Sequence, residues 1–402
     1  MRKHLLEEEL LGLAENHLAP NYKPFPVIAR SAKGCWITDV EGRVYMDMLS
    51  GYSVLNLGHG HPRILKALRE QVERIAVFPR AFQTEELILF AKELAEFCGM
   101  EMILPMSSGA EAVETAIKLA RKWAYTRKGV AKDKAEIIVC DNNFHGRTTT
   151  IVGFSSEPQY RDLFGPATPG FKSVPFGDHE VFLKAITPNT AAFLVEPIQG
   201  EGGIIVPPEG YLSKCREICR RNNVLFIADE IQTGFARTGR MFACDRENVK
   251  PDIFILGKAL GGGVLPVSAI AGSAELLRVF EPGDHGSTFG GNPLACHIAR
   301  EALRILRKGR FDERAEELGG YLMLGLGDIN RRFIKEIRGQ GLLIGVELEK
   351  EGPDAHEFCG RLSKKGILCK ETKKYVIRFS PPLTITKRQL DWALKRIRQV
   401  LT

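Results

Sequence analysis

The chain has 402 residues, of which 44% are hydrophobic and 26% charged, ordinary values for a soluble globular protein of two or three domains. This composition excludes a disordered, collagen-like or disulfide-scaffold chain. The 56 Lys and Arg exceed the 49 Asp and Glu by only 7, and no basic cluster interleaved with aromatics indicates nucleic-acid binding. No apolar run reaches about 18 residues, and the acidic N-terminus resembles neither a signal nor a transit peptide, so we expect a cytoplasmic protein without membrane contact.

The nine cysteines are scattered and form no CxxC pair. Cys215 and Cys219 lie close together on an expected helix, a spacing that could hold a metal ion. Because no other Cys or His clusters near them, we favour free thiols in a reducing compartment and expect no metal site.

The first three quarters of the chain predict a layered α/β structure. Residues 1–20 are expected to form an amphipathic helix, and residues 34–47 alternate around a Glu-Gly turn, which indicates a hairpin. Further on, expected helices at 64–76, 85–97, 110–126 and 209–222 alternate with strands at 136–140, 191–196, 224–229 and 252–257. These strands are continuously apolar, which is typical of strands buried on both faces. The pattern predicts an α/β fold with a mostly parallel central sheet.

Beyond about residue 285 the pattern becomes mixed. Helices are expected at 292–308 and near 311–333, strands at 342–348 and 375–379, and a last helix at 386–401. This indicates a smaller α+β domain. We therefore expect a large domain at 46–284, a small domain at 285–402, and an N-terminal segment, 1–45, that packs with the small domain.

Charged and aromatic residues follow the expected strands, at the edge where ligands bind in a parallel sheet. They are Phe144 and Arg147 after the first strand, Glu196 and Glu201 after the second, Asp229 at the end of the third, and Lys258 after the fourth. Each alone is a weak signal, because such a lysine is usually solvated and such an Asp usually caps a helix.

A phosphate-binding signal precedes these strand ends. Ser108 and Gly109 open a strongly helical run, and a helix N-terminus presents free N–H groups to an anion, although an ordinary N-cap has the same sequence. Combined with a strand-end lysine and a buried acid, it completes the parts needed to hold pyridoxal 5′-phosphate. The lysine would form the Schiff base, and the acid would keep the pyridine nitrogen protonated.

Other classes of protein fit less well. A dinucleotide-binding oxidoreductase would need GxGxxG after the first strand, and a Walker ATPase would need GxxxxGK followed by Ser or Thr; neither motif is present. A non-catalytic module built on this fold would be expected to lose Lys258, which is present.

Long segments resemble the class III, fold type I, PLP-dependent aminotransferases. The similar segments are SSGAEAVETAIKLAR, FLVEPIQGEGGIIVPPEGYL, VLFIADEIQTGFARTGRMFACDRENVKPDIFILGKALGGG and HGSTFGGNPLA. The similarity runs from about Tyr22 to the end of the chain. It implies a large PLP-binding domain and a small domain built from both termini.

The resemblance also implies a cofactor site. Lys258 matches the Schiff-base lysine, Asp229 the partner of the pyridine nitrogen, Gln232 the group that hydrogen-bonds the ring hydroxyl, and Phe144 the aromatic that stacks on the ring. The implied phosphate contacts are Ser108, Gly109 and Ala110, together with Ser287 and Thr288 of the neighbouring subunit. The last two imply a homodimer with both active sites at its interface.

Three shorter segments, NYKPFPV, SGYSVLN and PRAFQT, are similar to the ornithine δ-aminotransferases of this family. In that resemblance Tyr22 and Tyr52 contact the substrate, and Arg147 holds the carboxylate far from the cofactor. Arg378 holds an α-carboxylate beside the cofactor. Glu201 covers Arg378 when the substrate has no carboxylate there, because a buried unpaired cation is costly.

The implied reaction moves the δ-amino group of ornithine to 2-oxoglutarate and gives glutamate and glutamate γ-semialdehyde, which cyclises to pyrroline-5-carboxylate. His145 and Gly202 depart from the ornithine enzymes compared, which often carry Trp and Ala at these positions. Acetylornithine, 4-aminobutyrate or another ω-amino donor therefore stays open as an alternative.

Overall fold

The computed structural model describes residues 6–329 and 332–401. Its largest sheet has seven strands in the order β4-β10-β9-β8-β7-β5-β6. Neighbours from β9 to β6 run parallel, whereas β10 is antiparallel to both β4 and β9. The strands are β4 (Met102–Met106), β5 (Glu136–Cys140), β6 (Phe171–Val174), β7 (Thr190–Val195), β8 (Leu225–Asp229), β9 (Ile253–Leu256) and β10 (Ser268–Gly272). The predicted α/β fold with a mostly parallel central sheet is confirmed.

The strands expected from continuous apolar runs coincide with β5, β7, β8 and β9, to within about one residue at each end. Every residue of β7, β8 and β9 is buried, as expected for strands covered on both faces. Three strands of this sheet, β4, β6 and β10, were not predicted from the sequence. β6 lies at the edge of the sheet and is only partly buried, so it lacks the apolar run of a central strand.

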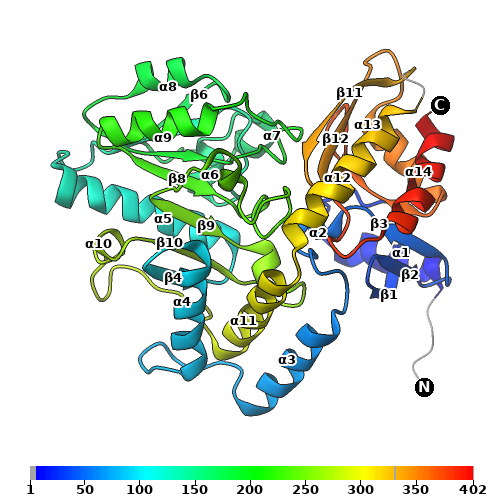
Figure 1. Ribbon diagram of the computed structural model, residues 1–402, viewed down its shortest axis with the longest axis horizontal. Helices are drawn as coiled ribbons and strands as arrows, with labels where there is room; N and C mark the ends of the chain where they lie inside the picture. Colours follow the sequence, from blue (N-terminus) through cyan, green and yellow to red (C-terminus); the bar gives the residue numbers. More distant parts are fainter. Residues whose placement is uncertain (1–5, 330–331, 402) are drawn as a thin grey trace.

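Helices cover both faces of this sheet (Figure 1). Alternate residues of β5, β7, β8 and β9 join two separate apolar clusters; one includes α5, and the other includes α4, α9 and α11. Cys215 and Cys219 pack in the second cluster, and all nine cysteines are buried and free. The longer helices are α3 (Pro62–Arg74), α4 (Glu85–Cys98), α5 (Gly109–Trp123), α9 (Tyr211–Arg221) and α11 (Pro293–Lys308). The shorter ones are α2 (Ser50–Ser53), α6 (Thr149–Gly153), α7 (Pro158–Arg161), α8 (His179–Ala185), α10 (Ala274–Leu277), η1 (Ala124–Lys128), η2 (Ala243–Glu247) and η3 (Lys258–Gly261).

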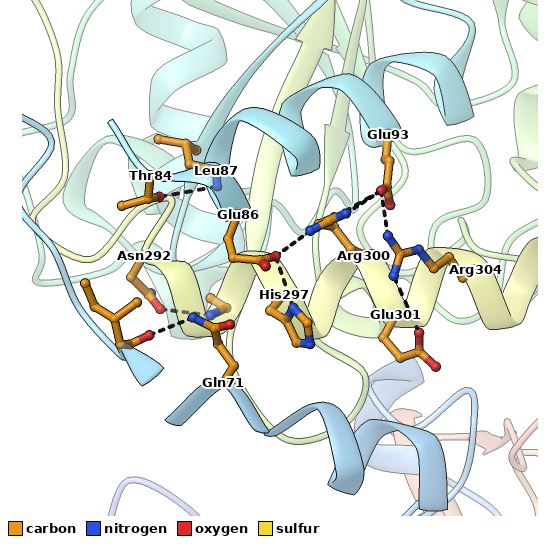
Figure 2. A network of polar contacts seen from close by, with 12 residues as sticks. Gln71, Thr84, Glu86, Leu87, Glu93, Asn292, His297, Arg300, Glu301 and Arg304 are labelled. Carbon is orange, nitrogen blue, oxygen red and sulfur yellow. Dashed lines mark hydrogen bonds and ion pairs between the residues drawn. The ribbon is translucent and has the colours of Figure 1, made fainter. Parts of the chain in front are cut away.

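Charged side chains join α4 to α11 (Figure 2). Arg300 of α11 lies 2.5 Å from Glu86 and 2.8 Å from Glu93, and Arg304 also lies 2.8 Å from Glu93. The Arg300 side chain is only 9% exposed, so loss of either acid would leave a buried cation poorly paired. The network fixes α11 against α4.

The domain limits at 45/46 and 284/285 remain predictions.

The remainder of the chain forms two four-stranded sheets, ordered β1-β2-β3-β13 and β11-β12-β15-β14. β3 pairs in parallel with β13, so the N-terminal hairpin and the C-terminal part of the chain share a sheet. The strands are β1 (Ala29–Lys33), β2 (Trp36–Asp39), β3 (Val44–Asp47), β11 (Ile334–Gln340), β12 (Leu343–Leu348), β13 (Ile367–Leu368), β14 (Lys370–Lys373) and β15 (Val376–Phe379). The helices packed with them are α12 (Phe311–Gly327), α13 (Ala355–Lys364) and α14 (Lys387–Leu401).

Two helices differ from their predicted form. α1 (Glu7–His17) lies within the predicted 1–20 but buries no residue, and Glu7 pairs with Arg43 at 2.6 Å. α12 ends at Gly327 rather than near 333, because the N–H of Asp328 closes the last turn on Leu324 O at 3.1 Å and β11 follows. Within the described ranges, the helices are too short or too polar for a membrane span.

Candidate active site

A cavity of about 170 Å³ lies at the carboxyl ends of the parallel strands. Asp229 ends β8, and Lys258 follows β9 at the start of η3, in the left-handed region with φ of 44°. The predicted site residues that line this cavity are Gly109, Ala110, Phe144, Glu201, Asp229, Gln232 and Lys258. They come together because the strands that carry them end at one edge of the sheet.

Asp229 is held by a neighbour that the sequence analysis did not place in the site. His145 Nδ1 lies 2.7 Å from Asp229 Oδ2, and the N–H of Ile231 donates to Oδ1 at 3.1 Å. Burial opposes the positive charge of His145, but the hydrogen bond to Asp229 and the negative charges of Asp229 and Glu196 together outweigh burial and raise the pKa of His145. Asp229 is therefore buried and held in position by two hydrogen-bond partners. The signal for His145 was its place beside Phe144 at the end of β5.

The amine of Lys258 is easier to deprotonate than an ordinary lysine. Burial lowers its pKa to about 8, against the opposing influence of Glu201 and Asp229. Nearby, Glu196 accepts the N–H of Phe144 at 2.9 Å, and burial raises the pKa of Glu196 to about 7. A lysine with this pKa has a substantial neutral fraction near pH 8, as a nucleophile or proton carrier requires.

The N-terminus of α5 faces the same cavity. Ser108 caps the helix: its hydroxyl accepts the Glu111 N–H at 3.2 Å, and Glu111 Oε2 accepts the N–H groups of Ser107 and Ser108. The next N–H groups, on Gly109 and Ala110, have no intrahelical acceptor and stand at the positive end of the helix. They are suited to a phosphate. A Cβ on Gly109 would lie 3.0 Å from Ile231 Cδ1, so glycine permits this close packing.

The donor set fits pyridoxal 5′-phosphate. The cavity combines a lysine amine, a buried carboxylate, a helix N-terminus and an aromatic ring, which are the groups this cofactor needs. Gln232 passes directly over the backbone of Gly200, where a Cβ would meet its Oε1 at 1.5 Å. Any side chain at position 200 would therefore displace Gln232 from the cavity wall.

Arg378 and Glu201 form an ion pair beside the cavity. Arg378, on β15, is 1% exposed, and its guanidinium carbon lies 4.7 Å from the ring centre of Tyr52. Its Nε and Nη2 have no hydrogen-bond partner among the described residues. Burial alone would disfavour the charge on Glu201, but Arg378, with smaller contributions from Lys258 and Gln232, outweighs burial and lowers the pKa of Glu201. Tyr52 is half-buried and left-handed, with φ of 61°.

Of the five predicted substrate residues, only Glu201 belongs to the cavity lining. Tyr22 is 73% exposed. Arg147 is exposed, and its guanidinium carbon lies 4.0 Å from the ring centre of Tyr160 and 5.7 Å from that of Phe144. Tyr160 was not singled out from the sequence.

Ser287 and Thr288 line a different hollow, of about 660 Å³, together with Ser107 and Glu111. The hydroxyl of Ser287 donates to Glu111 Oε1 at 3.3 Å and accepts the N–H of Gly290 at 3.0 Å. Thr288 is exposed. Within one chain, neither residue reaches the cavity that holds Lys258.

Comparison with known proteins gives a consistent result. Residues 17–401 match the family model of class III aminotransferases. The chain is 55% identical to an ornithine aminotransferase of Geobacillus sp. (strain WCH70), with 98% of each covered, and 54% identical to that of Bacillus subtilis (strain 168), again with 98% of each covered. A crystal structure of the ornithine aminotransferase from Toxoplasma gondii ME49 superposes with a TM-score of 0.97 at 44% identity, covering 99% of this chain and 96% of that one.

The acetylornithine aminotransferase of Elizabethkingia anophelis superposes with a TM-score of 0.89 at 44% identity, covering 98% of each chain. The family match spans nearly the whole chain, and the buried lysine and carboxylate occupy the strand ends that such chemistry needs. This protein belongs to the class III aminotransferases.

Proposed function

We propose that this PLP-dependent aminotransferase transfers the δ-amino group of ornithine to 2-oxoglutarate. The products would be glutamate and glutamate γ-semialdehyde, which cyclises to pyrroline-5-carboxylate. The observation that carries the proposal is the Glu201–Arg378 pair beside Tyr52. Ornithine has no carboxylate near its reacting carbon, whereas 2-oxoglutarate has one. A site that accepts both needs a cation that can pair with a protein acid in the first case and with the substrate in the second.

The cofactor would be held by the cavity residues. Gly109 and Ala110 would bind the phosphate through backbone N–H groups, Phe144 would cover a ring face, and Gln232 would reach the ring hydroxyl. Asp229, oriented by His145, would face the ring nitrogen. When bound, the cofactor supplies a carbonyl that takes up amino groups and a protonated ring that withdraws electrons. The role of Ser108 is the cap that fixes this end of α5.

Lys258 would carry the proton. Its pKa of about 8 gives it a neutral fraction near physiological pH, so it can remove a proton from the amino-bearing carbon of the substrate and return one later. Burial keeps competing water away from the amine.

Substrate carboxylates would be shared between two arginines. With ornithine, the δ-amine points into the cavity and the α-carboxylate lies outward at Arg147, with Tyr22 and Tyr52 beside the chain. Glu201 then keeps the buried Arg378 paired. With 2-oxoglutarate, the α-carboxylate displaces Glu201 and binds Nε and Nη2 of Arg378, which have no partner among the described residues. The far carboxylate binds Arg147.

We further propose a homodimer in which Ser287 and Thr288 complete the phosphate site of the neighbouring subunit. Two facts support it. These residues lie away from their own chain's cavity, and they line a large open hollow at the N-terminal side of α5.

N-acetylornithine is the second candidate donor, favoured by the similarity to the Elizabethkingia enzyme and by His145. The two donors differ at the α-amine, which is free and charged in ornithine and acylated in the alternative. A polar group placed to meet the free amine, such as the hydroxyl of Tyr52, would reject the acylated one.

A donor panel tests the proposal. Purified holoenzyme is mixed with 2-oxoglutarate and, separately, ornithine, N-acetylornithine, 4-aminobutyrate, lysine and putrescine, and glutamate formation is measured. We expect ornithine to have the highest kcat/KM and to yield pyrroline-5-carboxylate. A preference of about tenfold or more for another donor, which corresponds to about 1.4 kcal/mol, would overturn the choice of substrate but not the transaminase assignment.

A further inference from the structure

Arg147 is held by aromatic rings rather than by acids. Among the described residues, no carboxylate lies within ion-pair range of its guanidinium. Its recorded contacts are the rings of Tyr160, at 4.0 Å, and Phe144, at 5.7 Å. Those two rings meet edge to face, with centres 6.0 Å apart and an interplanar angle of 76°. Tyr160 is therefore the nearer of the two rings and the one not expected to contact the cofactor.

Tyr160 lies on a short segment whose N-terminal side contacts two other parts of the protein. It belongs to α7, directly after Glu157, which pairs with Lys373 of β14 at 2.9 Å. Ser156 Oγ accepts the N–H of Asn142, in the loop that carries Arg147, at 2.7 Å. The side chains of Glu157 and Lys373 are each 34% exposed, so this ion pair is only partly solvated. The backbone next to Tyr160 is thus held by two contacts that do not involve Arg147.

A fixed ring face has a definite effect on an arginine. An exposed arginine samples many rotamers, and each must be given up when it binds a carboxylate. A ring against the flat face attracts the cation and limits its motion, while the N–H groups at the edge stay free for a bidentate carboxylate.

We infer that Tyr160 is a positioning residue that holds Arg147 ready for the substrate carboxylate remote from the reacting carbon. The inference rests on the proposed function, which assigns that carboxylate to Arg147. It adds a residue outside the cavity lining that sets how tightly ornithine and 2-oxoglutarate bind.

A double-mutant cycle tests the inference. The holoenzymes compared are wild type, Tyr160→Leu, Tyr160→Phe, Arg147→Gln and the Tyr160→Leu/Arg147→Gln double variant, with single-turnover measurements where steady-state rates are too low. Tyr160→Leu should lower kcat/KM for ornithine about 3- to 30-fold, mainly through KM, because the leucine keeps apolar bulk but has no ring face. Tyr160→Phe keeps the ring and should rescue the loss to within about twofold.

The cycle separates positioning from general packing. In the Arg147→Gln background, Tyr160→Leu should cost less than about twofold, because the residue it positions is already gone. Equilibrium binding of PLP to the apoenzyme and the thermal midpoint of the holoenzyme should stay near wild type. An equal loss in both backgrounds, or a loss of PLP affinity, would overturn the inference and make Tyr160 a packing partner of Phe144.

Failure of the proposed function would look different. If Arg147→Gln leaves KM for ornithine and for 2-oxoglutarate unchanged, Arg147 does not bind their carboxylates, and the substrate assignment fails together with the role of Tyr160. If Arg147→Gln raises KM but Tyr160→Leu does not, only the inference about Tyr160 is wrong.

Discussion

The cofactor cavity around Lys258 and the substrate entrance around Arg147 hold their charges in opposite ways. In the cavity, the titratable groups are buried, and His145 lies 2.7 Å from Asp229. At the entrance, Arg147 is exposed and rests on aromatic rings, and Tyr22 is 73% exposed. Paired buried charges cost much to rearrange, whereas an exposed cation can exchange partners. The first region suits a resident cofactor and the second a substrate that must leave.

Arg378 lies between these regions and shares features of both. It is buried like the cavity groups, yet two of its donors have no partner among the described residues. Its ion-pair partner, Glu201, is 23% exposed. Substitutions should therefore cost most in the cavity, less at the Arg378–Glu201 pair and least at the substrate entrance.

The largest effect is expected for Lys258→Ala. Without the amine, no group remains to move the substrate proton, and general acid–base catalysis of this kind is worth about 10²- to 10⁴-fold. We expect turnover to fall by at least that factor, with PLP bound only non-covalently. Borohydride reduction of wild type followed by peptide mapping should label Lys258, and a label on a different lysine would contradict the assignment.

Asp229→Asn should have the next largest effect. The amide keeps the size of the carboxylate but removes the charge that would face the ring nitrogen and that raises the pKa of His145. Loss of such a preorganised partner costs about 10²- to 10³-fold in kcat. PLP titration of the apoenzyme serves as the control for binding. Activity within a factor of about ten of wild type would argue against Asp229 as the electrostatic partner.

Glu201→Ala should slow the two half-reactions to different extents. Arg378 would remain buried without its acid whenever ornithine is bound, and hydrogen bonds to charged groups are worth about 1.5–3 kcal/mol. We expect the ornithine half-reaction to slow about 10- to 100-fold, with the glutamate half-reaction affected less. Single-turnover kinetics of each half-reaction checks this. Equal slowing of both would show that Glu201 acts on something other than the pairing of Arg378.

Tyr52→Phe tests a proposed substrate contact outside the cavity lining with a matched change. The phenylalanine keeps the ring against Arg378 and differs only by the hydroxyl proposed to meet the α-amine of ornithine. A β-branched residue would be a poor probe, because position 52 has φ of 61° and would be strained. We expect ornithine to lose about 1–2 kcal/mol in kcat/KM, while 4-aminobutyrate, which has no α-amine, changes little. A uniform loss for both donors would argue against this contact.

The part of the site carried by strand ends could be predicted from the sequence. Asp229 and Lys258 follow strands whose apolar runs are unmistakable, and parallel strands end at one edge. The pairing of His145 with Asp229 could not be predicted in this way, because local sequence patterns do not determine the order of strands in a sheet. In this sheet β7 lies between β5 and β8. β10 was missed because SAIAG is short and built from small residues.

The substrate entrance was beyond local patterns altogether. Tyr160 contacts Arg147 from a short helix, α7, and the residue before this helix, Glu157, pairs with Lys373 of β14. Such contacts between loops and a second sheet depend on the complete fold. The resemblance to a family supplied the roles of Tyr22 and Arg147, but the surroundings that tune them are visible only in three dimensions.

The smallest expected effect concerns pH and isolates the amine of Lys258 from the rest of catalysis. Burial lowers its pKa to about 8, and only the neutral amine attacks a carbonyl, so covalent capture of PLP by the apoenzyme should speed up as pH rises through 8. Between pH 7.5 and 8.5 the neutral fraction rises roughly threefold for a single group of this pKa. The measurement is the borohydride-trapped label on Lys258 after timed mixing, normalised to the reaction of PLP with a free alkylamine. Glu201 opposes the downward shift, so Glu201→Gln should move the midpoint to lower pH. A midpoint at or above the ordinary lysine value of about 10.4 would mean that the cavity does not desolvate this amine. The contrast between a buried cofactor cavity and an exposed substrate entrance would then be lost.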